Sequence, residues 1–264
     1  MLLHRVLTAI VAAVLILLVL FAFPPPAARA VIASIILAAA WEWAKFLSLV
    51  GAAERLSYVA AIAALLGAVT WLTPSPDSTE FILKIGLAWW VAALIWAFFY
   101  PTPISRTVGW VCGALVLVPA FVALDSLYSL RPSVLLFALV IIWAADTGAY
   151  FAGRHFGRIK LAPRISPKKT WEGVIGGLVA VVLVLVAARF YWLDIDIAVI
   201  IPFCLAVATL SVVGDLTVSM FKRSAGLKDS GRVFPGHGGV LDRIDSVTAA
   251  APLFALGISW AGLI

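Results

Sequence analysis

The sequence predicts an all-α fold, that of a polytopic integral membrane protein with about nine transmembrane helices. Its 264 residues are 64% apolar and only 12% charged, whereas ordinary soluble domains are about 45–50% apolar and about 25% charged. The apolar residues form about nine runs, each near the length that crosses a hydrocarbon core of about 30 Å. Most basic residues lie in alternate connections between these runs, as in membrane proteins with one preferred orientation.

The expected helices follow the apolar runs in order. The first run, residues 7–23, is longer than the apolar core of a secretory signal peptide, so we expect a retained helix. Three prolines at 24–26 end this helix, because proline lacks the backbone N–H that a helix needs to continue. The remaining runs span residues 27–41, 58–72, 81–100, 108–124, 134–150, 174–191, 197–213 and 247–263.

The basic residues predict an orientation for these helices. With the N-terminus in the cytoplasm and nine alternating spans, fifteen of the 19 Lys and Arg residues fall on the cytoplasmic side. Only Arg29, Arg131 and Arg189 fall on the opposite side, so the positive-inside rule favours an N-in, C-out topology. We divide the chain into N-terminal transmembrane helices (1–133) and a C-terminal catalytic transmembrane region with cytoplasmic polar loops (134–264), which together form one integral membrane unit.

Charged residues are concentrated between Gly214 and Ser246, where four acids and five bases interrupt an otherwise apolar sequence. If the run that enters this stretch stays helical, Asp215, Ser219 and Lys222 share one face, because they are spaced i, i+4, i+7. Asp242 and Asp245, spaced i, i+3, share another. Carboxylates near a helix end in a membrane need cations, and hard oxygen ligands suit Mg²⁺. Alternatively, Asp242, Arg243 and Asp245 only pair with one another as interfacial salt bridges.

A glycine-rich, basic loop separates these acids. Its glycines would let the backbone approach a ligand closely and turn N–H groups toward phosphate oxygens. The side chains of Lys222, Arg223 and Lys228 could bind phosphates as charges or forks. The alternative is a flexible basic loop that touches anionic lipid headgroups. For His237 we favour a ligand contact or a structural role over proton transfer, because its spacing assigns no proton path.

A second polar cluster lies between residues 143 and 173. Asp146 falls near the end of an apolar run, where an ionisable residue is a functional candidate by default. Lys168 and Lys169 precede a predicted helix start with an acid, Glu172, in its first turn; these lysines serve either as phosphate ligands or as a solvated orientation signal. Glu42 also lies near the end of a run, and we expect it to pair with Lys45, three residues on, outside the site.

Several of these residues fall in motifs that resemble a known family. The segments Ser219-Met-Phe-Lys222-Arg223, Lys228-Asp229-Ser-Gly231 and Phe234-Pro235-Gly-His237-Gly238-Gly239-Val-Leu-Asp242-Arg243-Ile-Asp245 are similar to the signature of phosphatidate cytidylyltransferases, the CDP-diacylglycerol synthases. The upstream segments DTGAYFAGRHFG and ISPKKTWEG are also similar to that family. The resemblance covers residues 146–246, and the N-terminal runs match only in being hydrophobic.

This resemblance implies that CTP and phosphatidate react to give CDP-diacylglycerol and pyrophosphate. It implies that Asp215 and Asp242 bind Mg²⁺, together with a second cation, and that Asp245 assists them. It also implies that His237 and its flanking glycines shape the triphosphate or leaving-group pocket. The candidate catalytic residues are Asp215, Asp242, Asp245 and Lys222; the candidate substrate-binding residues are Asp146, Lys168, Lys169, Ser219, Arg223, Lys228, His237, Gly238, Gly239 and Arg243.

The expected partners are CTP, phosphatidate and membrane lipid, with the active site on the cytoplasmic face of the cell (inner) membrane. The net charge of +6 is spread over several loops, so we expect no nucleic-acid partner; a homodimer is compatible with this interpretation. Three alternatives stay open. One is a CTP-dependent enzyme with another lipid acceptor, such as a polyprenol. The second, from a different class, is an ion-coupled transporter in which Asp146 and Asp215 are the coupling groups. The third is a structural or lipid-anchoring membrane protein, which would not explain the clustered acids.

Overall fold

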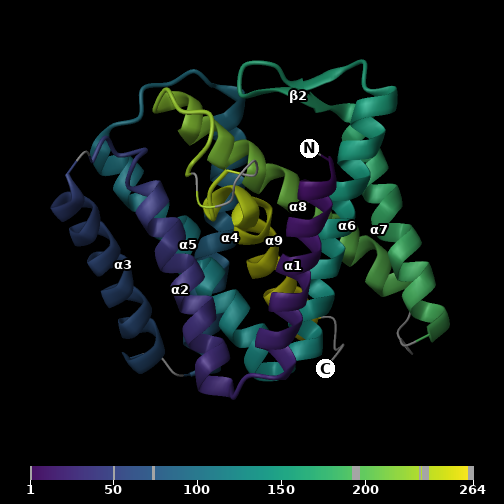
Figure 1. The fold of residues 1–264 in the computed structure, drawn as a ribbon, viewed down its shortest axis with the longest axis horizontal. Helices are drawn as coiled ribbons and strands as arrows, with labels where there is room; N and C mark the ends of the chain where they lie inside the picture. The colour runs from purple at the N-terminus through teal and green to yellow at the C-terminus, as the bar shows by residue number, and fades with distance from the viewer. Residues whose placement is uncertain are drawn as a thin grey trace.

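Nine α-helices and one short β-hairpin make up the part of the chain that the computed structural model describes, residues 2–49, 51–72, 75–191, 197–231, 233 and 238–260. Each helix coincides with one of the expected apolar runs (Figure 1). Their bounds are α1 Leu2–Phe21, α2 Pro25–Trp43, α3 Ala52–Leu72, α4 Pro76–Phe98, α5 Arg106–Leu130, α6 Pro132–Phe156, β1 Lys160–Ala162, β2 Ser166–Thr170, α7 Trp171–Tyr191, α8 Ile197–Ser224 and α9 Leu241–Trp260.

Local signals in the sequence explain several helix starts. Helix α2 begins directly at Pro25, because proline is tolerated in the first turn, where its missing N–H would have no partner. Helices α4 and α5 begin after Ser75 and Ser105, whose hydroxyl oxygens accept hydrogen bonds from backbone N–H groups inside the first turn. Serine is favoured at this position for that reason.

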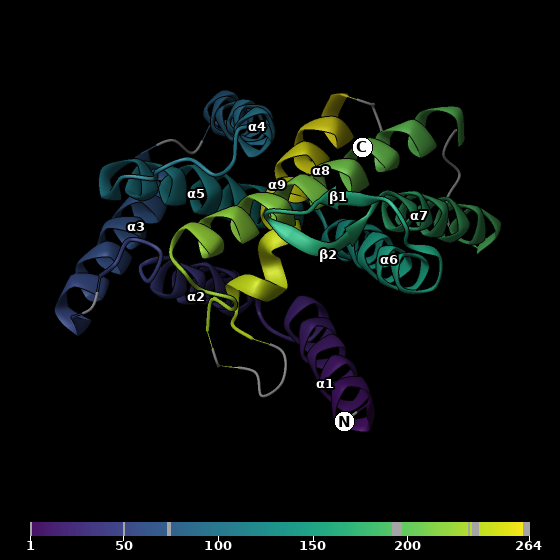
Figure 2. The same ribbon diagram turned by 90° about the horizontal axis from the view of Figure 1, so that it is seen from above.

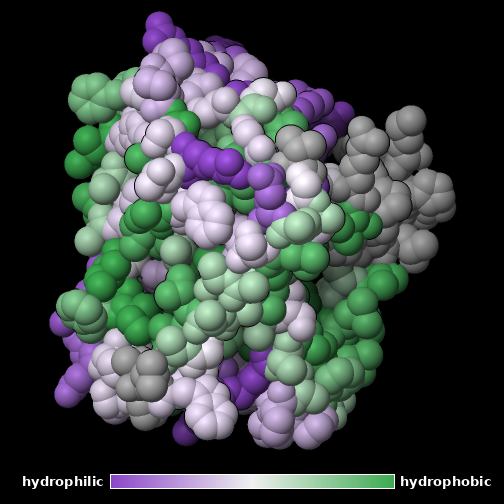
Figure 3. Space-filling view, turned by 90° about the vertical axis from the view of Figure 1, so that its left-hand side faces the viewer, coloured by the Kyte–Doolittle hydropathy of each residue, from purple (hydrophilic) through white to green (hydrophobic). Residues whose placement is uncertain are grey.

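The helices have the length and composition of membrane spans. Seven of the described helices, α2 to α8, are long and apolar enough to cross a membrane. Many large apolar side chains face outward, among them Phe98 (81% exposed) and Leu183 (65%), as expected where lipid is the solvent. Figure 3 shows one face of the molecule, where hydrophobic residues occupy the middle and hydrophilic residues gather mainly toward the upper and lower ends. The prediction of a polytopic α-helical membrane protein is therefore confirmed, with the small hairpin as an addition.

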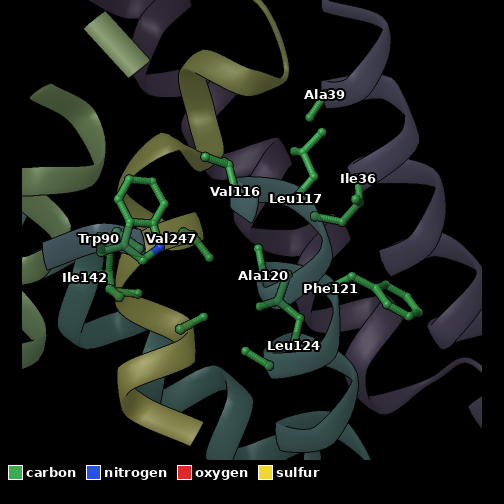
Figure 4. Close-up of a cluster of buried hydrophobic side chains, with 14 of the residues drawn as sticks. Ile36, Ala39, Trp90, Val116, Leu117, Ala120, Phe121, Leu124, Ile142 and Val247 are labelled. Carbon is green, nitrogen blue, oxygen red and sulfur yellow. The ribbon is translucent and has the colours of Figure 1, made fainter. Parts of the chain in front are cut away.

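Helix α9 lies at the centre of the helix arrangement, packed against α4, α5 and α8 and also touching α2 and α6 (Figure 2). Its buried alanines, Ala249 to Ala251, allow close packing on several sides. Val247 at its start belongs to a buried hydrophobic cluster with side chains from α2, α4, α5 and α6 (Figure 4). This central position fixes the first turn of α9, which carries Asp242 and Asp245.

Helices α6 and α7 pack together along a seam of small residues. A Cβ atom added at Gly148 would lie 2.5 Å from the Cβ of Ala180 and 2.6 Å from the carbonyl oxygen of Gly176. Small residues are enriched where membrane helices approach this closely. The hairpin connects these two helices, with Lys160 opposite Thr170 and Ala162 opposite Ser166. The seam therefore sets where the hairpin, with Lys168 and Lys169, lies (Figure 1).

Gly148→Ala should destabilise the protein, by about 1–3 kcal/mol, because the added methyl group overlaps atoms of α7. The matched control is Gly67→Ala in α3, where a Cβ atom would meet nothing within 4 Å. There the same change should be neutral or stabilising, by up to about 1 kcal/mol, because alanine is the better helix former. Thermal unfolding of both variants in one detergent checks the prediction, and equal melting temperatures would contradict it.

Candidate active site

A cavity of about 1190 Å³ lies where the hairpin, the ends of α6 and α8, and the starts of α7 and α9 meet. Ten of the predicted site residues line it: Asp146, Lys168, Lys169, Asp215, Lys222, Lys228, Gly238, Asp242, Arg243 and Asp245. Ser219, Arg223 and Gly239 are not among the described residues that line it, and His237 lies outside the described residues. The fold thus brings the two polar clusters of the sequence together around one space.

Asp215 enters the cavity from α8, which is helical from before this residue to beyond Lys222, as the spacing predicts. One carboxylate oxygen, Oδ2, lies 2.7 Å from Nζ of Lys169 on the hairpin. The other, Oδ1, accepts a hydrogen bond from the hydroxyl of Ser219, one turn along the same helix, at 3.2 Å. Ser219 is itself buried, so its contact in the structure is with the carboxylate, which it orients.

Asp242 enters from the first turn of α9 and is held by three donors. Its Oδ1 accepts from Nζ of Lys222 at 2.7 Å. Its Oδ2 accepts from the backbone N–H groups of Ser230 and Gly239, both at 2.9 Å. Gly238 has φ +80°, and a Cβ atom there would lie 2.5 Å from Oδ2. The loop backbone can wrap around this carboxylate because position 238 is glycine, which adopts positive φ without strain.

Three further acids line the cavity, Asp146, Asp229 and Asp245. Asp245 is buried, and its Oδ1 accepts from the backbone N–H of Ser246 at 2.9 Å. The hydroxyl of Ser246 donates to Oδ1 of Asp146 on α6 at 3.2 Å. Asp146 and Asp245 also lie close enough to Asp215 for their charges to interact. The cavity therefore gathers several acidic side chains beside the lysines of the hairpin, α8 and the following loop.

The sequence of this chain is similar to those of known proteins. Residues 3–260 match the model of the cytidylyltransferase family. The chain belongs to the cytidylyltransferase family. A relative from Pseudomonas aeruginosa named phosphatidate cytidylyltransferase is 39% identical over 271 residues, covering 99% of this chain and 98% of the relative. One of the same name from Haemophilus influenzae is 37% identical over 285 residues, covering 97% and 98%. A third, from Staphylococcus epidermidis, is 48% identical over 120 residues, covering 45% and 46%.

Within this cytidylyltransferase fold, Arg223 contacts the protein's own backbone. Its Nε donates to the carbonyl oxygen of Ile165 in the hairpin at 3.3 Å, and its Nη1 donates to that of Leu227 at 3.0 Å. Ile165 is buried, so the guanidinium fastens the hairpin to the loop that follows α8. The predicted phosphate contact of Arg223 stays a prediction, and its contacts in the structure are those of a positioning group.

Sequence reasoning missed part of the site. The expected Glu42–Lys45 pair is wrong: Glu42 accepts hydrogen bonds from Ser230, Val240 and Leu241, and Lys45 donates to the carbonyl oxygen of Ser230. Helical geometry allows an i, i+3 pair, but unpaired loop N–H groups compete for the buried carboxylate. The position of Glu42 at the end of an apolar run could have indicated that its carboxylate has a partner elsewhere in the protein.

Several further residues that line the cavity were also not predicted as ligands, among them two on one face of α6. Tyr150 and Arg154 line the cavity from α6, and Lys160 lines it from β1. Nη1 of Arg154 donates to the hydroxyl of Tyr150 at 3.0 Å. The spacing of Asp146, Tyr150 and Arg154, four residues apart, places them on one face of α6. That spacing was the signal by which Tyr150 and Arg154 could have been found.

The donor set of the cavity fits magnesium. No group of three or more His, Cys, Asp or Glu side chains arranged to hold a metal ion occurs among the described residues. Mg²⁺ does not require one, because it usually takes one or two carboxylates and completes its shell with water and substrate phosphates. The carboxylates of Asp215 and Asp242 offer such hard oxygen donors, and a bound Mg²⁺ would have to replace the lysine ammonium group that one oxygen of each contacts in the structure.

Lys222→Met should cost about 3–5 kcal/mol of stability, because it leaves the carboxylate of Asp242 buried without its counter-charge. Only 9% and 8% of these two side chains is exposed. The control is Arg106→Met, which breaks an ion pair with Glu54 at the starts of α5 and α3, where the two side chains are 55% and 51% exposed. Such exposed pairs contribute about 0.2–1 kcal/mol. Thermal unfolding in detergent measures both, and similar losses would refute the buried pair.

Proposed function

We propose that this chain transfers a cytidylyl group from CTP to phosphatidate, giving CDP-diacylglycerol and pyrophosphate. The observation that carries the proposal is one cavity at the end of membrane-spanning helices that joins five carboxylates to a set of lysines. Near full-length similarity to relatives named phosphatidate cytidylyltransferase supports the same reaction. CTP and phosphatidate are then its substrates, while a homodimer and the absence of a nucleic-acid partner stay predictions.

The chemistry asks little of the protein beyond position and charge. A phosphate oxygen of phosphatidate forms a bond to the α-phosphorus of CTP, and the bond from that phosphorus to the departing pyrophosphate breaks. Such transfers depend mainly on alignment and on neutralising charge. Lys169, Lys222 and Lys228, which line the cavity, would counter the phosphate charges. A phosphate monoester is largely ionised at neutral pH, since its second pKa is about 6, so no strong general base is required.

Asp215 and Asp242 are our proposed magnesium ligands, with Asp245 as a helper and a second cation nearby. Bound Mg²⁺ would neutralise phosphate oxygens and polarise the phosphorus under attack. The chain prepares these carboxylates itself: Ser219 orients Asp215, and two backbone N–H groups orient Asp242. The hairpin and α8 supply the lysines that counter both carboxylates before any ligand arrives.

The cavity is large enough for two substrates. Its volume of about 1190 Å³ exceeds the roughly 300–1,000 Å³ of ordinary small-molecule sites. The loop after α8, with Lys228 and Gly238, would take the triphosphate. The α6 side borders outward-facing apolar residues, because Tyr150 lines the cavity and is also 54% exposed, next to Phe151 at 56%. We therefore assign Tyr150 and Arg154 to the phosphatidate side, where acyl chains can stay in lipid.

We further propose nine spans with the N-terminus inside the cytoplasm and the C-terminus outside, in the cell (inner) membrane. Helices α1 and α9 would then cross the bilayer with the other seven. The clustering of basic residues in the hairpin and in the loop before α9 supports this orientation. It places the cavity at the cytoplasmic face, where CTP is available.

Purified protein supplied with α-labelled CTP, Mg²⁺ and phosphatidate should transfer label into extracted lipid. Asp242→Asn should reduce this transfer to the background level, because it removes a proposed magnesium ligand and the counter-charge of Lys222. Asp77→Asn, the same change at an exposed position in α4, should leave transfer unchanged. Label transferred to a polyprenol acceptor and not to phosphatidate would replace the proposed substrate, and normal turnover of Asp242→Asn would refute its metal role.

Arg154→Gln should raise the KM for phosphatidate by roughly tenfold and leave the KM for CTP unchanged, because it removes one charge-assisted hydrogen bond to a phosphate. Lys228→Gln should do the opposite and raise the KM for CTP. Steady-state kinetics with a short-chain phosphatidate measure both constants. If Arg154→Gln raised only the KM for CTP, the assignment of the two sides would be wrong.

A further inference from the structure

A carboxylate from the N-terminal half of the chain accepts hydrogen bonds from the loop before α9 and from the start of α9. Glu42, near the end of α2, is only 2% exposed. Its Oε1 accepts from the backbone N–H of Val240 at 3.0 Å, and its Oε2 accepts from that of Leu241 at 2.8 Å and from the hydroxyl of Ser230 at 2.7 Å. Three donors, one within the loop and two where the loop joins α9, thus converge on a single buried carboxylate.

A second side chain of the same helix end strengthens this contact. Nζ of Lys45 donates to the carbonyl oxygen of Ser230 at 2.6 Å. Ser230 is therefore bound through its hydroxyl by Glu42 and through its carbonyl by Lys45. Its backbone N–H in turn donates to Oδ2 of Asp242 at 2.9 Å. One residue of the loop thus joins the end of α2 to the proposed magnesium ligand.

The glycines of the loop make room for the Glu42 carboxylate. A Cβ atom at Gly231 or at Gly239 would overlap its oxygen atoms. The N–H of Gly239 also donates to Oδ2 of Asp242, so this glycine lies between the two carboxylates. Side chains at positions 231 and 239 would displace Glu42, and with it the backbone that holds Asp242.

We propose that Glu42 is a positioning residue for the transfer reaction. Its carboxylate holds Ser230, Val240 and Leu241, which fixes the loop ends and the first turn of α9, and thereby sets the direction of Asp242. A negative charge is also favourable at this place, because the N-terminus of a helix carries a partial positive charge. The inference rests on the proposed function, since it concerns how the magnesium ligand of that reaction is held.

The chemistry of the contact selects a carboxylate over an amide. Glu42 accepts hydrogen bonds at both oxygens, and each oxygen faces a backbone N–H group. Glutamine offers one oxygen and one NH₂ group, so Glu42→Gln places a donor against a donor in either orientation. A buried N–H group then loses its partner, although the side chain keeps its size. Glu42→Gln therefore tests the contact without opening a cavity.

Glu42→Gln should lower kcat by roughly 10- to 100-fold and raise the Mg²⁺ concentration for half-maximal activity, as is typical when a residue behind a metal ligand is lost. The control is Glu54→Gln in the first turn of α3, where Glu54 is exposed and lies 3.4 Å from Arg106; it should match the wild type. Normal kcat and Mg²⁺ dependence of folded Glu42→Gln protein would overturn the proposal, even if its melting temperature fell.

A readout without substrate separates this inference from the proposed function. In hydrogen–deuterium exchange, the segment that contains Val240 and Leu241 should exchange faster in Glu42→Gln than in Glu54→Gln. Equal exchange in the two variants would overturn the proposal that Glu42 holds this segment. A wild type without transferase activity would refute the proposed function, while the exchange difference would still support the contact. Ser230→Ala removes one of the three hydrogen bonds to Glu42, so it should lower kcat and speed up exchange, each by less than Glu42→Gln does. If Glu42→Gln protein does not fold, Ser230→Ala becomes the test, and a Ser230→Ala variant with wild-type kcat and wild-type exchange would overturn the proposal.

Discussion

The cost of placing carboxylates at the ends of apolar helices governs this structure. An ionised group in such surroundings must be paired or hydrogen-bonded, because little water is available to solvate it. Asp215 and Asp242 meet this requirement with lysines from different elements, the hairpin and α8. Each pair therefore ties two elements together, and the cavity forms where these ties meet. Helix packing sets the positions of the hairpin and of α9, and the two ion pairs fasten both elements to α8 at the cavity.

Much of the architecture could be predicted from the sequence, because lipid imposes a length and a composition on each span. All nine described helices fall on the expected runs, and the shared face of Asp215, Ser219 and Lys222 follows from helical periodicity alone. The hairpin could not be predicted this way. Its strands are three and five residues long, and a lysine pair in a loop is also the common signal of membrane orientation.

Glu42 shows where local reasoning stops. Its nearest opposite charge in the sequence is Lys45, yet its partners lie 188 to 199 residues further along the chain. No periodicity connects positions so far apart. The glycines at 231 and 239 did indicate close approach to the loop backbone, and the structure shows that a carboxylate of the protein makes this approach. The sequence alone could predict that another group approaches the backbone at these glycines, but it could not identify that group as the carboxylate of Glu42.

Contacts hold the elements around the cavity from two sides. On one side, the glycine seam between α6 and α7 sets the hairpin; on the other, Glu42 and Arg223 hold the loop before α9. Between them, α8 and α9 approach closely beside the site, since a Cβ atom at Gly214 would lie 2.5 Å from the carbonyl oxygen of Asp245. The carboxylates are thus already ordered in the folded protein, and the favourable free energy of helix packing offsets the conformational entropy that their side chains lose. Substrates then meet groups that are already aligned, so less of their binding energy is spent on organising the site.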